Sequence, residues 1–170
     1  ANGTFRDVTI EAFPAAKLAA VAAAFADADH DGDLDLIPGT RVLRNNGNGR
    51  FADITAAAKL ERSFDTPVAV VPTDFDNRRD IDVLVVGTSQ PPALFKNERD
   101  GTFRNVWGEV GLPHTTRYTS VTTADVNKDL APDFFFARAD TVAMAAFQAI
   151  NVFVSAHESR RHGAGGDDER

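Results

Sequence analysis

The feature that most constrains this chain is an aspartate-rich stretch that occurs three times. In the first copy, between Asp27 and Asp35, five aspartates alternate with other residues and lead directly into apolar residues. A second copy spans 74–82 and a third spans 125–133, so the copies begin 47 and 51 residues apart. Repetition with a period of about 20–50 residues indicates tandem supersecondary units. We therefore expect an array of similar units.

A second motif recurs in phase with the acidic stretches. An Asn-Gly or Asp-Gly turn precedes a phenylalanine after the first and second acidic stretches, and the chain opens with such a turn, but none follows the third stretch. These turns beside short apolar stretches are a strong signal for β-hairpins. The phenylalanines hold one register, which predicts that all three lie in the core: Phe5, Phe51 and Phe103.

The segment 15–26 conflicts with this pattern, because its many alanines favour a helix. The equivalent segments 67–73 and 118–124 are rich in Val and Thr, which favour strands. The repeat therefore predicts a strand in the first copy as well. Each unit then consists of a strand, an acidic loop, a strand, a hairpin and a further strand.

Four short antiparallel strands repeated in tandem are typical of β-propeller blades. The sequence predicts an all-β fold with about three blades over residues 1–155, followed by a polar, mobile tail at 156–170. Closed propellers have at least about four blades. Three explanations stay open: a partial propeller from a longer protein, an irregular ring closed by its own first strands, and a propeller completed by another copy through strand addition.

The alternating acidic side chains predict a site for a hard cation. Five aspartates within nine residues repel one another, and a bound cation relieves that repulsion. Oxygen ligands, a glycine and the absence of a Cys or His partner favour calcium. The expected ligands in the first copy are the side chains of Asp27, Asp29, Asp31 and Asp35 with the backbone carbonyl of Asp33.

The other two copies depart from the first. In the third copy Leu130 replaces the glycine, and four oxygen ligands remain: Asp125, Asn127, Asp129 and Asp133. In the second copy Arg78 replaces the third ligand and Arg79 the glycine, and four aspartates remain: Asp74, Asp76, Asp80 and Asp82. Two interpretations stay open for the second copy. Either it binds an ion, or the guanidinium of Arg78 lies among the aspartates in the ion's place.

Together the two motifs resemble the FG-GAP/VCBS repeat family, whose blades form propellers like that of the integrin α-subunit head. The loop pattern Asp-x-Asp-x-Asp-Gly-x-x-Asp-Leu is intact at 27–36, and the hairpin pattern Leu-x-x-Asn-x-Gly-x-Gly-x-Phe-x-Asp-x-Thr is nearly intact at 43–55. An EF-hand would need an acid at its twelfth position, where the first copy has Pro38. The resemblance covers residues 1 to about 137. It implies calcium in the blade loops, an extracellular, cell-surface or periplasmic location, and a binding or scaffolding role.

The composition argues against several classes of function. A net charge of −7 argues against a nucleic-acid partner, and no apolar stretch is long enough to insert into a membrane. The chain has no cysteine and no nucleophile or phosphate-binding motif, so we expect no catalysis. We expect a calcium-stabilised interaction module that binds a protein, a glycan or further copies of itself. Two alternatives stay open: a self-assembling surface or filament subunit, and an accessory propeller of a larger polysaccharide-acting enzyme.

Overall fold

The computed structural model of the protein describes residues 3–13, 20–60, 66–112, 114, 117–139 and 148–153. Within these residues the strands form three antiparallel sheets, which follow one another along the chain. Blade 1 consists of β1 (Ala23–Ala26), β2 (Asp35–Pro38), β3 (Leu43–Asn45) and β4 (Phe51–Asp53). Blade 2 consists of β5 (Pro67–Thr73), β6 (Asp82–Gly87), β7 (Ala93–Asn97) and β8 (Phe103–Asn105). Blade 3 consists of β9 (Tyr118–Ala124), β10 (Asp133–Ala139) and β11 (Gln148–Phe153).

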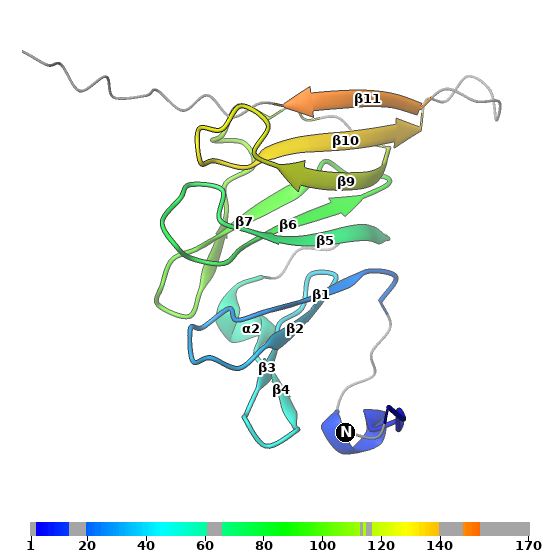
Figure 1. The fold of residues 1–170 in the computed structure, drawn as a ribbon, viewed down its shortest axis with the longest axis vertical. Coiled ribbons are helices and arrows are strands. Elements are labelled where there is room, and N and C mark those ends of the chain that lie inside the picture. Colours follow the sequence, from blue (N-terminus) through cyan, green and yellow to red (C-terminus); the bar gives the residue numbers. More distant parts are fainter. Residues whose placement is uncertain are drawn as a thin grey trace, which may run out of the picture.

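This architecture confirms the prediction of an all-β fold built from tandem propeller-like blades. In blades 1 and 2 each strand pairs with the next strand in the sequence, and the acidic loop joins the first strand to the second. Figure 1 shows the three blades stacked in a row, with the N-terminal segment beside blade 1 and far from blade 3. The described part of the chain is therefore an open row of blades.

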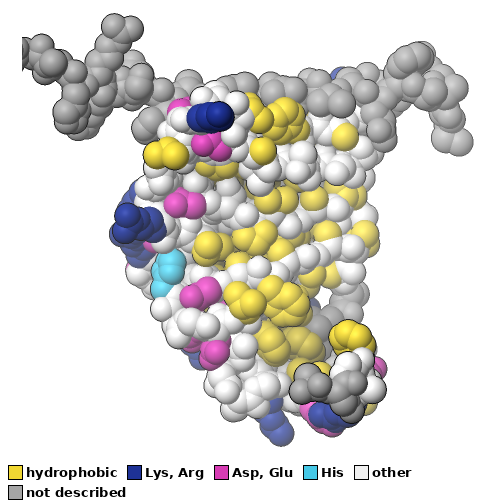
Figure 2. All heavy atoms as spheres, viewed as in Figure 1, with side chains coloured by type: hydrophobic (Ala, Val, Ile, Leu, Met, Phe, Trp, Pro, Cys, Tyr) yellow, Lys and Arg dark blue, Asp and Glu magenta, His cyan; other side chains and the backbone are white. Residues whose placement is uncertain are grey.

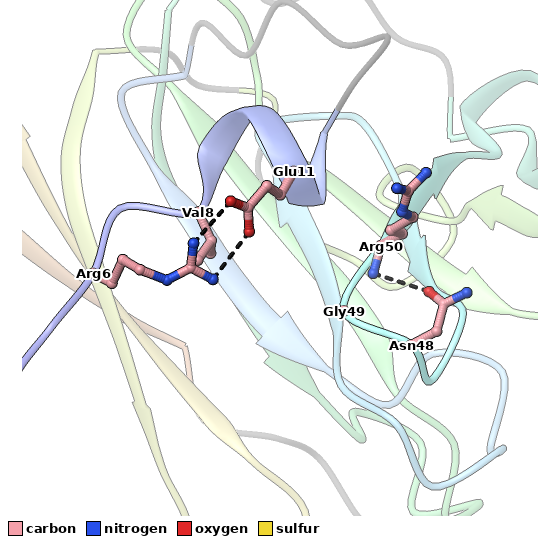
Figure 3. A pocket seen from close by; sticks show the side chains of 6 residues that line it. All are labelled: Arg6, Val8, Glu11, Asn48, Gly49 and Arg50. Atoms are coloured by element: carbon pink, nitrogen blue, oxygen red, sulfur yellow. Dashed lines mark hydrogen bonds and ion pairs between the residues drawn. The ribbon is translucent and has the colours of Figure 1, made fainter. Parts of the chain in front are cut away.

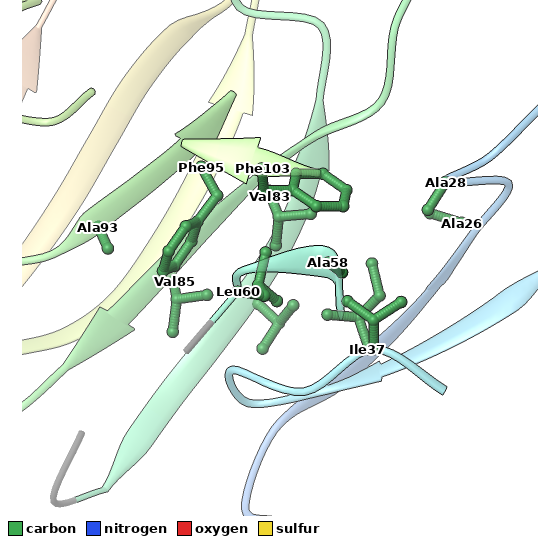
Figure 4. Packing of buried hydrophobic residues seen from close by; sticks show 12 residues of the cluster. Ala26, Ala28, Ile37, Ala58, Leu60, Val83, Val85, Ala93, Phe95 and Phe103 are labelled. Atoms are coloured by element: carbon green, nitrogen blue, oxygen red, sulfur yellow. The ribbon is translucent and has the colours of Figure 1, made fainter. Parts of the chain in front are cut away.

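The core lies between the blades, and β6 shows why. Val83 and Val85 pack in one cluster with Ile37 of blade 1 (Figure 4), whereas Leu84 and Val86 belong to a second cluster. That second cluster contains three aromatic residues of blade 3: Tyr118, Phe134 and Phe136. A strand buried on both faces needs an uninterrupted apolar sequence, which β6 has.

The prediction of a common core register for the three phenylalanines is wrong for Phe5. Phe103 is buried and Phe51 is half-buried and stacked on Phe13, with 4.8 Å between ring centroids, but Phe5 is fully exposed. Phe51 and Phe103 lie in strands that pair with β3 and β7. Residues 3–8 form no strand, so no sheet carries Phe5 into a core.

The turn that follows each hairpin motif is nevertheless the same in all three copies. The backbone N–H of Thr9 donates to Asp7 at 2.9 Å, that of Thr55 to Asp53 at 3.1 Å, and that of Trp107 to Asn105 at 3.1 Å. A short helix begins at each of the two threonines, α1 (Thr9–Ala12) and α2 (Thr55–Ala58). The opening segment therefore keeps the local structure of the repeat without its strand.

The alanine-rich segment is a strand where it is described. Ala23–Ala26 pairs with β2, which confirms that the repeat outweighs helix propensity there. Residues 14–19 and the predicted tail at 156–170 lie outside the described residues. No helix among the described residues is long and apolar enough to cross a membrane.

Candidate cation sites in the acidic loops

The three acidic loops share one hydrogen-bonding design. The first aspartate of each loop accepts the backbone N–H of the residue five positions later, at 3.2 Å in Asp27, 2.9 Å in Asp74 and 3.0 Å in Asp125. The last aspartate accepts the N–H of the residue that follows the first. These last aspartates are all buried: Asp35, Asp82 and Asp133. Each loop is therefore closed from both ends by carboxylates.

Each loop also contains two residues with positive φ, at its fourth and sixth positions. The sixth position is Gly32 in the first loop, with φ 91°, and Leu130 in the third, with φ 71°. The third loop therefore gives a leucine the conformation that the first loop gives a glycine. A residue with a Cβ in the left-handed region costs roughly 1–2 kcal/mol. The hydrogen bonds shared by the three loops therefore hold even a leucine in this conformation.

In the first loop three carboxylates converge. Asp27, Asp29 and Asp31 offer ligand oxygens that all lie within 4.8 Å of one another. One oxygen of Asp27 is buried and has no hydrogen-bond partner. Carboxylates at such separations repel one another unless a cation lies between them. The donor set, all oxygen and mostly charged, fits calcium.

The remaining two predicted ligands of the first loop, Asp33 and Asp35, are not among these three. Asp35 is buried, and its oxygens accept the N–H of Ala28 at 3.2 Å and that of Asn45 at 2.8 Å. Burial raises the pKa of Asp35, and the charges of Asp29 and Asp31 act in the same direction. A cation in the loop would oppose this rise. The half-buried Asp33 donates its backbone N–H to Asp31 at 2.9 Å.

In the second loop Asp74, Asp76 and Asp82 converge within 4.8 Å. Burial raises the pKa of Asp82 to about 6, with further contributions from the charges of Asp76 and Asp74. The guanidinium of Arg78, which the sequence offered as a substitute for the ion, stays at the rim. It is 44% exposed, and its Nη1 lies 3.8 Å from Asp76. The closer cation is Lys96 of β7, whose Nζ lies 2.5 Å from the same carboxylate.

Asp80, the remaining aspartate of the second loop, joins blade 2 to blade 1. Its buried carboxylate lies 2.5 Å from Nε of Arg99 and 3.4 Å from Nε2 of His30 in the first loop. Burial alone would raise the pKa of Asp80, but the hydrogen bond and charge of Arg99 outweigh it, so that pKa is lowered. The sequence placed Asp80 among the possible ligands, whereas the structure pairs it with Arg99 of its own blade and brings it against His30 of the first loop.

The third loop is less compact. Its Asp129 accepts hydrogen bonds from the side chain of Asn127 and from the backbone N–H of Ala131, both at 2.9 Å. Asp133 is fully buried at the start of β10. Among the described residues three carboxylates converge within 4.8 Å in the first two loops and not in the third. The three carboxylates of the third loop therefore do not converge as those of the first two loops do.

Residues 74–136 match the family model of the FG-GAP-like repeat. The match confirms the resemblance drawn from the loop and hairpin motifs, and comparison with curated proteins finds no match to this chain. The matched FG-GAP-like repeat begins at the second acidic loop and ends in β10, so it takes three strands from blade 2 and extends into blade 3.

Sequence reasoning missed two residues of these loops, Lys96 and Arg99. Both lie in or beside the hairpin of blade 2, about twenty residues after the aspartates that they contact. The available signal was the alignment of the two blades, which places Lys96 directly before Asn97, the residue equivalent to Asn45 in the hairpin motif.

A surface pocket also lies beside blade 1 (Figure 3). It is lined by exposed residues of the N-terminal segment and of the hairpin between β3 and β4: Arg6, Val8, Glu11, Asn48, Gly49 and Arg50. Arg6 and Glu11 form a two-bonded ion pair at 2.8 and 3.0 Å. With these charges paired to each other at an exposed site, the pocket is a weaker candidate than the acidic loops.

Proposed function

We propose that this chain is a calcium-stabilised interaction module of an exported protein, in which calcium makes the first acidic loop rigid and takes no part in chemistry. The observation that carries the proposal is the convergence of Asp27, Asp29 and Asp31 with an unpartnered buried oxygen on Asp27. These three side chains would hold the ion, with Asp33 and Asp35 close by in the same loop. The third loop, with Asp125, Asn127, Asp129 and Asp133, is proposed as a second and weaker site.

Calcium would act on stability through charge. The first loop contains five aspartates and no Lys or Arg. An ion of charge +2 reduces the repulsion among these aspartates. It also links parts of the loop that are otherwise held together only by hydrogen bonds. Calcium sites of extracellular modules have Kd values of about 10⁻⁴–10⁻³ M. A site of that affinity would fill outside the cytoplasm, and the proposed location is accordingly extracellular, at the cell surface or periplasmic.

An exposed apolar face supports an interaction role, and it favours a protein partner. Figure 2 shows hydrophobic side chains gathered over the face on which the first strands of the blades, β1, β5 and β9, lie. Val21 and Phe25, in and beside β1, are 74% and 59% exposed. Contiguous exposed apolar surface marks binding sites in soluble proteins.

The test of calcium binding compares thermal unfolding of the protein in calcium and in a chelator. At a free concentration of about 100 times Kd, calcium stabilises the folded chain by about 2.7 kcal/mol. For a domain of this size that raises Tm by about 5–10 °C. Asp29→Asn should remove most of this rise, and the exposed Glu109→Gln should keep it. A wild-type Tm that is the same in calcium and in chelator would contradict the proposal.

The test of the interaction role is sedimentation of the chain in calcium, alone and with candidate proteins. Phe25→Ser should leave Tm nearly unchanged and abolish association with the partner. If the chain sediments as a concentration-dependent oligomer that Phe25→Ser disperses, the face joins copies of the chain. If only soluble glycans shift its sedimentation, the protein partner is wrong.

A further inference from the structure

The second loop differs from the first in the basic residues around it. The alignment of blades 1 and 2 on their loop and hairpin motifs equates Asp31 with Arg78, Gly32 with Arg79, Arg44 with Lys96, and Gly47 with Arg99. The first loop therefore has five aspartates and no Lys or Arg, whereas the second has four aspartates and two arginines, with Lys96 and Arg99 beside it. The substitutions move the second loop toward neutrality without any ion.

Lys96 is the residue that brings charge inside this loop. Its Nζ lies 2.5 Å from Oδ2 of Asp76, and the two side chains are 18% and 20% exposed. The ring of Phe75 lies beneath the same ammonium, with 6.0 Å from Nζ to the ring centroid. Asp76 itself belongs to the trio of converging carboxylates with Asp74 and Asp82. The ammonium therefore contacts the cluster that an ion would occupy.

The equivalent residue in blade 1 behaves differently. Arg44 and Lys96 both precede the asparagine whose backbone N–H donates to the last aspartate of its loop, at 2.8 Å in each blade. Arg44 is exposed, and no ion pair joins it to a described carboxylate of the first loop. At this position of the repeat, blade 1 therefore has the solvated guanidinium of Arg44, and blade 2 has the half-buried ammonium of Lys96.

We propose that Lys96 is a built-in cation of the second acidic loop and that this loop takes no calcium. Calcium binds carboxylate oxygens at about 2.3–2.6 Å, and the ammonium already lies at that distance from Asp76. An ion of charge +2 would also stand next to Lys96 and within reach of Arg78. The inference rests on the proposed function only in taking calcium as the ion of the first loop.

Shortening Lys96 should convert the second loop into a calcium site. The other oxygen of Asp76 is buried without a hydrogen-bond partner, so the three carboxylates stay available once the ammonium is gone. Equilibrium dialysis followed by elemental analysis gives the number of calcium ions per chain. Lys96→Met should bind one more calcium ion than wild type. Lys96→Arg, which keeps the charge, and Arg44→Met, the matched substitution in blade 1, should bind the wild-type number.

Asp76→Asn in the wild-type background gives a second readout that does not need Lys96→Met to fold. It should leave the number of bound calcium ions unchanged and lower Tm by the same amount in calcium and in chelator, because it removes the partner of Lys96. Asp29→Asn should instead lower the number of bound ions by one.

The outcomes separate this inference from the proposed function. If Asp76→Asn lowers the calcium count of the wild-type chain by one, the second loop binds calcium and the inference is wrong. A folded Lys96→Met variant with the wild-type count also overturns it. If wild type and Asp29→Asn bind no calcium while Lys96→Met binds one ion, the proposed function fails and the role of Lys96 stands.

Discussion

A buried hydrogen bond of Asn97 couples blade 2 to blade 1. The residue is 3% exposed, and its side-chain amide donates to the carbonyl of Ala28 in the first acidic loop at 2.8 Å. The same amide donates to Ile81 at 3.3 Å, and its oxygen accepts the N–H of Arg99 at 3.0 Å. Asn45, its equivalent in blade 1, keeps the two bonds within its own blade, to Leu34 at 3.2 Å and from Gly47 at 3.0 Å.

Comparison of the single variants Asn97→Ala and Asn45→Ala therefore isolates the hydrogen bond between the blades. Asn97→Ala leaves the carbonyl of Ala28, a buried residue, without that partner. A buried polar group left unsatisfied costs about 1–3 kcal/mol. We expect the loss in unfolding free energy from Asn97→Ala to exceed that from Asn45→Ala by about this amount.

Urea unfolding measured in a chelator gives both losses without a contribution from calcium. Intrinsic fluorescence reports on Trp107, which packs at the boundary of blades 2 and 3, and far-UV circular dichroism reports on all strands. The two probes should give coincident transitions in wild type. Equal losses for the two variants would refute the reasoning, since the bond between the blades would then contribute nothing measurable.

Further predictions concern the loops. The pKa of Asp82 is raised to about 6 from an ordinary 3.8, so the folded state binds the proton of this carboxyl more tightly than the unfolded state does. The contribution of Asp82 to the unfolding free energy in chelator should therefore fall by up to about 3 kcal/mol between pH 4 and pH 6 and stay low above pH 6. Asp82→Asn should reduce this fall, as measured by urea unfolding at a series of pH values. Leu130→Gly should raise the unfolding free energy by up to about 1 kcal/mol, because it relieves a φ of 71° at an exposed side chain, and an unchanged or lower value would contradict the assigned backbone. Gly47→Ala should lower Tm more than Gly49→Ala, since both have positive φ but only at Gly47 would the new Cβ lie 2.8 Å from a carboxylate oxygen of Asp33; equal shifts would contradict that packing.

Local chemistry made the blades predictable from the sequence. The acidic loops and the Asn-Gly turns are determined by neighbouring residues, and their regular period placed each strand to within a few positions. The prediction succeeded even at Ala23–Ala26, where the intrinsic propensity favours a helix. It failed at Phe5, because a register inferred from a repeat requires a neighbouring strand to pair with.

The contacts within and between the loops were harder to predict, because they depend on strands that become neighbours only in the folded sheet. Lys96 reaches Asp76 from the third strand of the blade, and Asn97 reaches Ala28 from 69 residues away. One of the two interpretations left open by the sequence puts a basic residue, Arg78, in the ion's place in the second loop. The structure gives that position to Lys96, since a lysine on β7 points across the loop while Arg78 stays at its rim.

Hydrogen exchange measured with and without calcium tests the central claim most directly, because it reports each loop separately. The account predicts that calcium slows exchange within 27–35, where the N–H of Gly32 donates to Asp27, and leaves exchange within 74–82 unchanged. Unchanged exchange within 27–35 at saturating calcium would contradict the account.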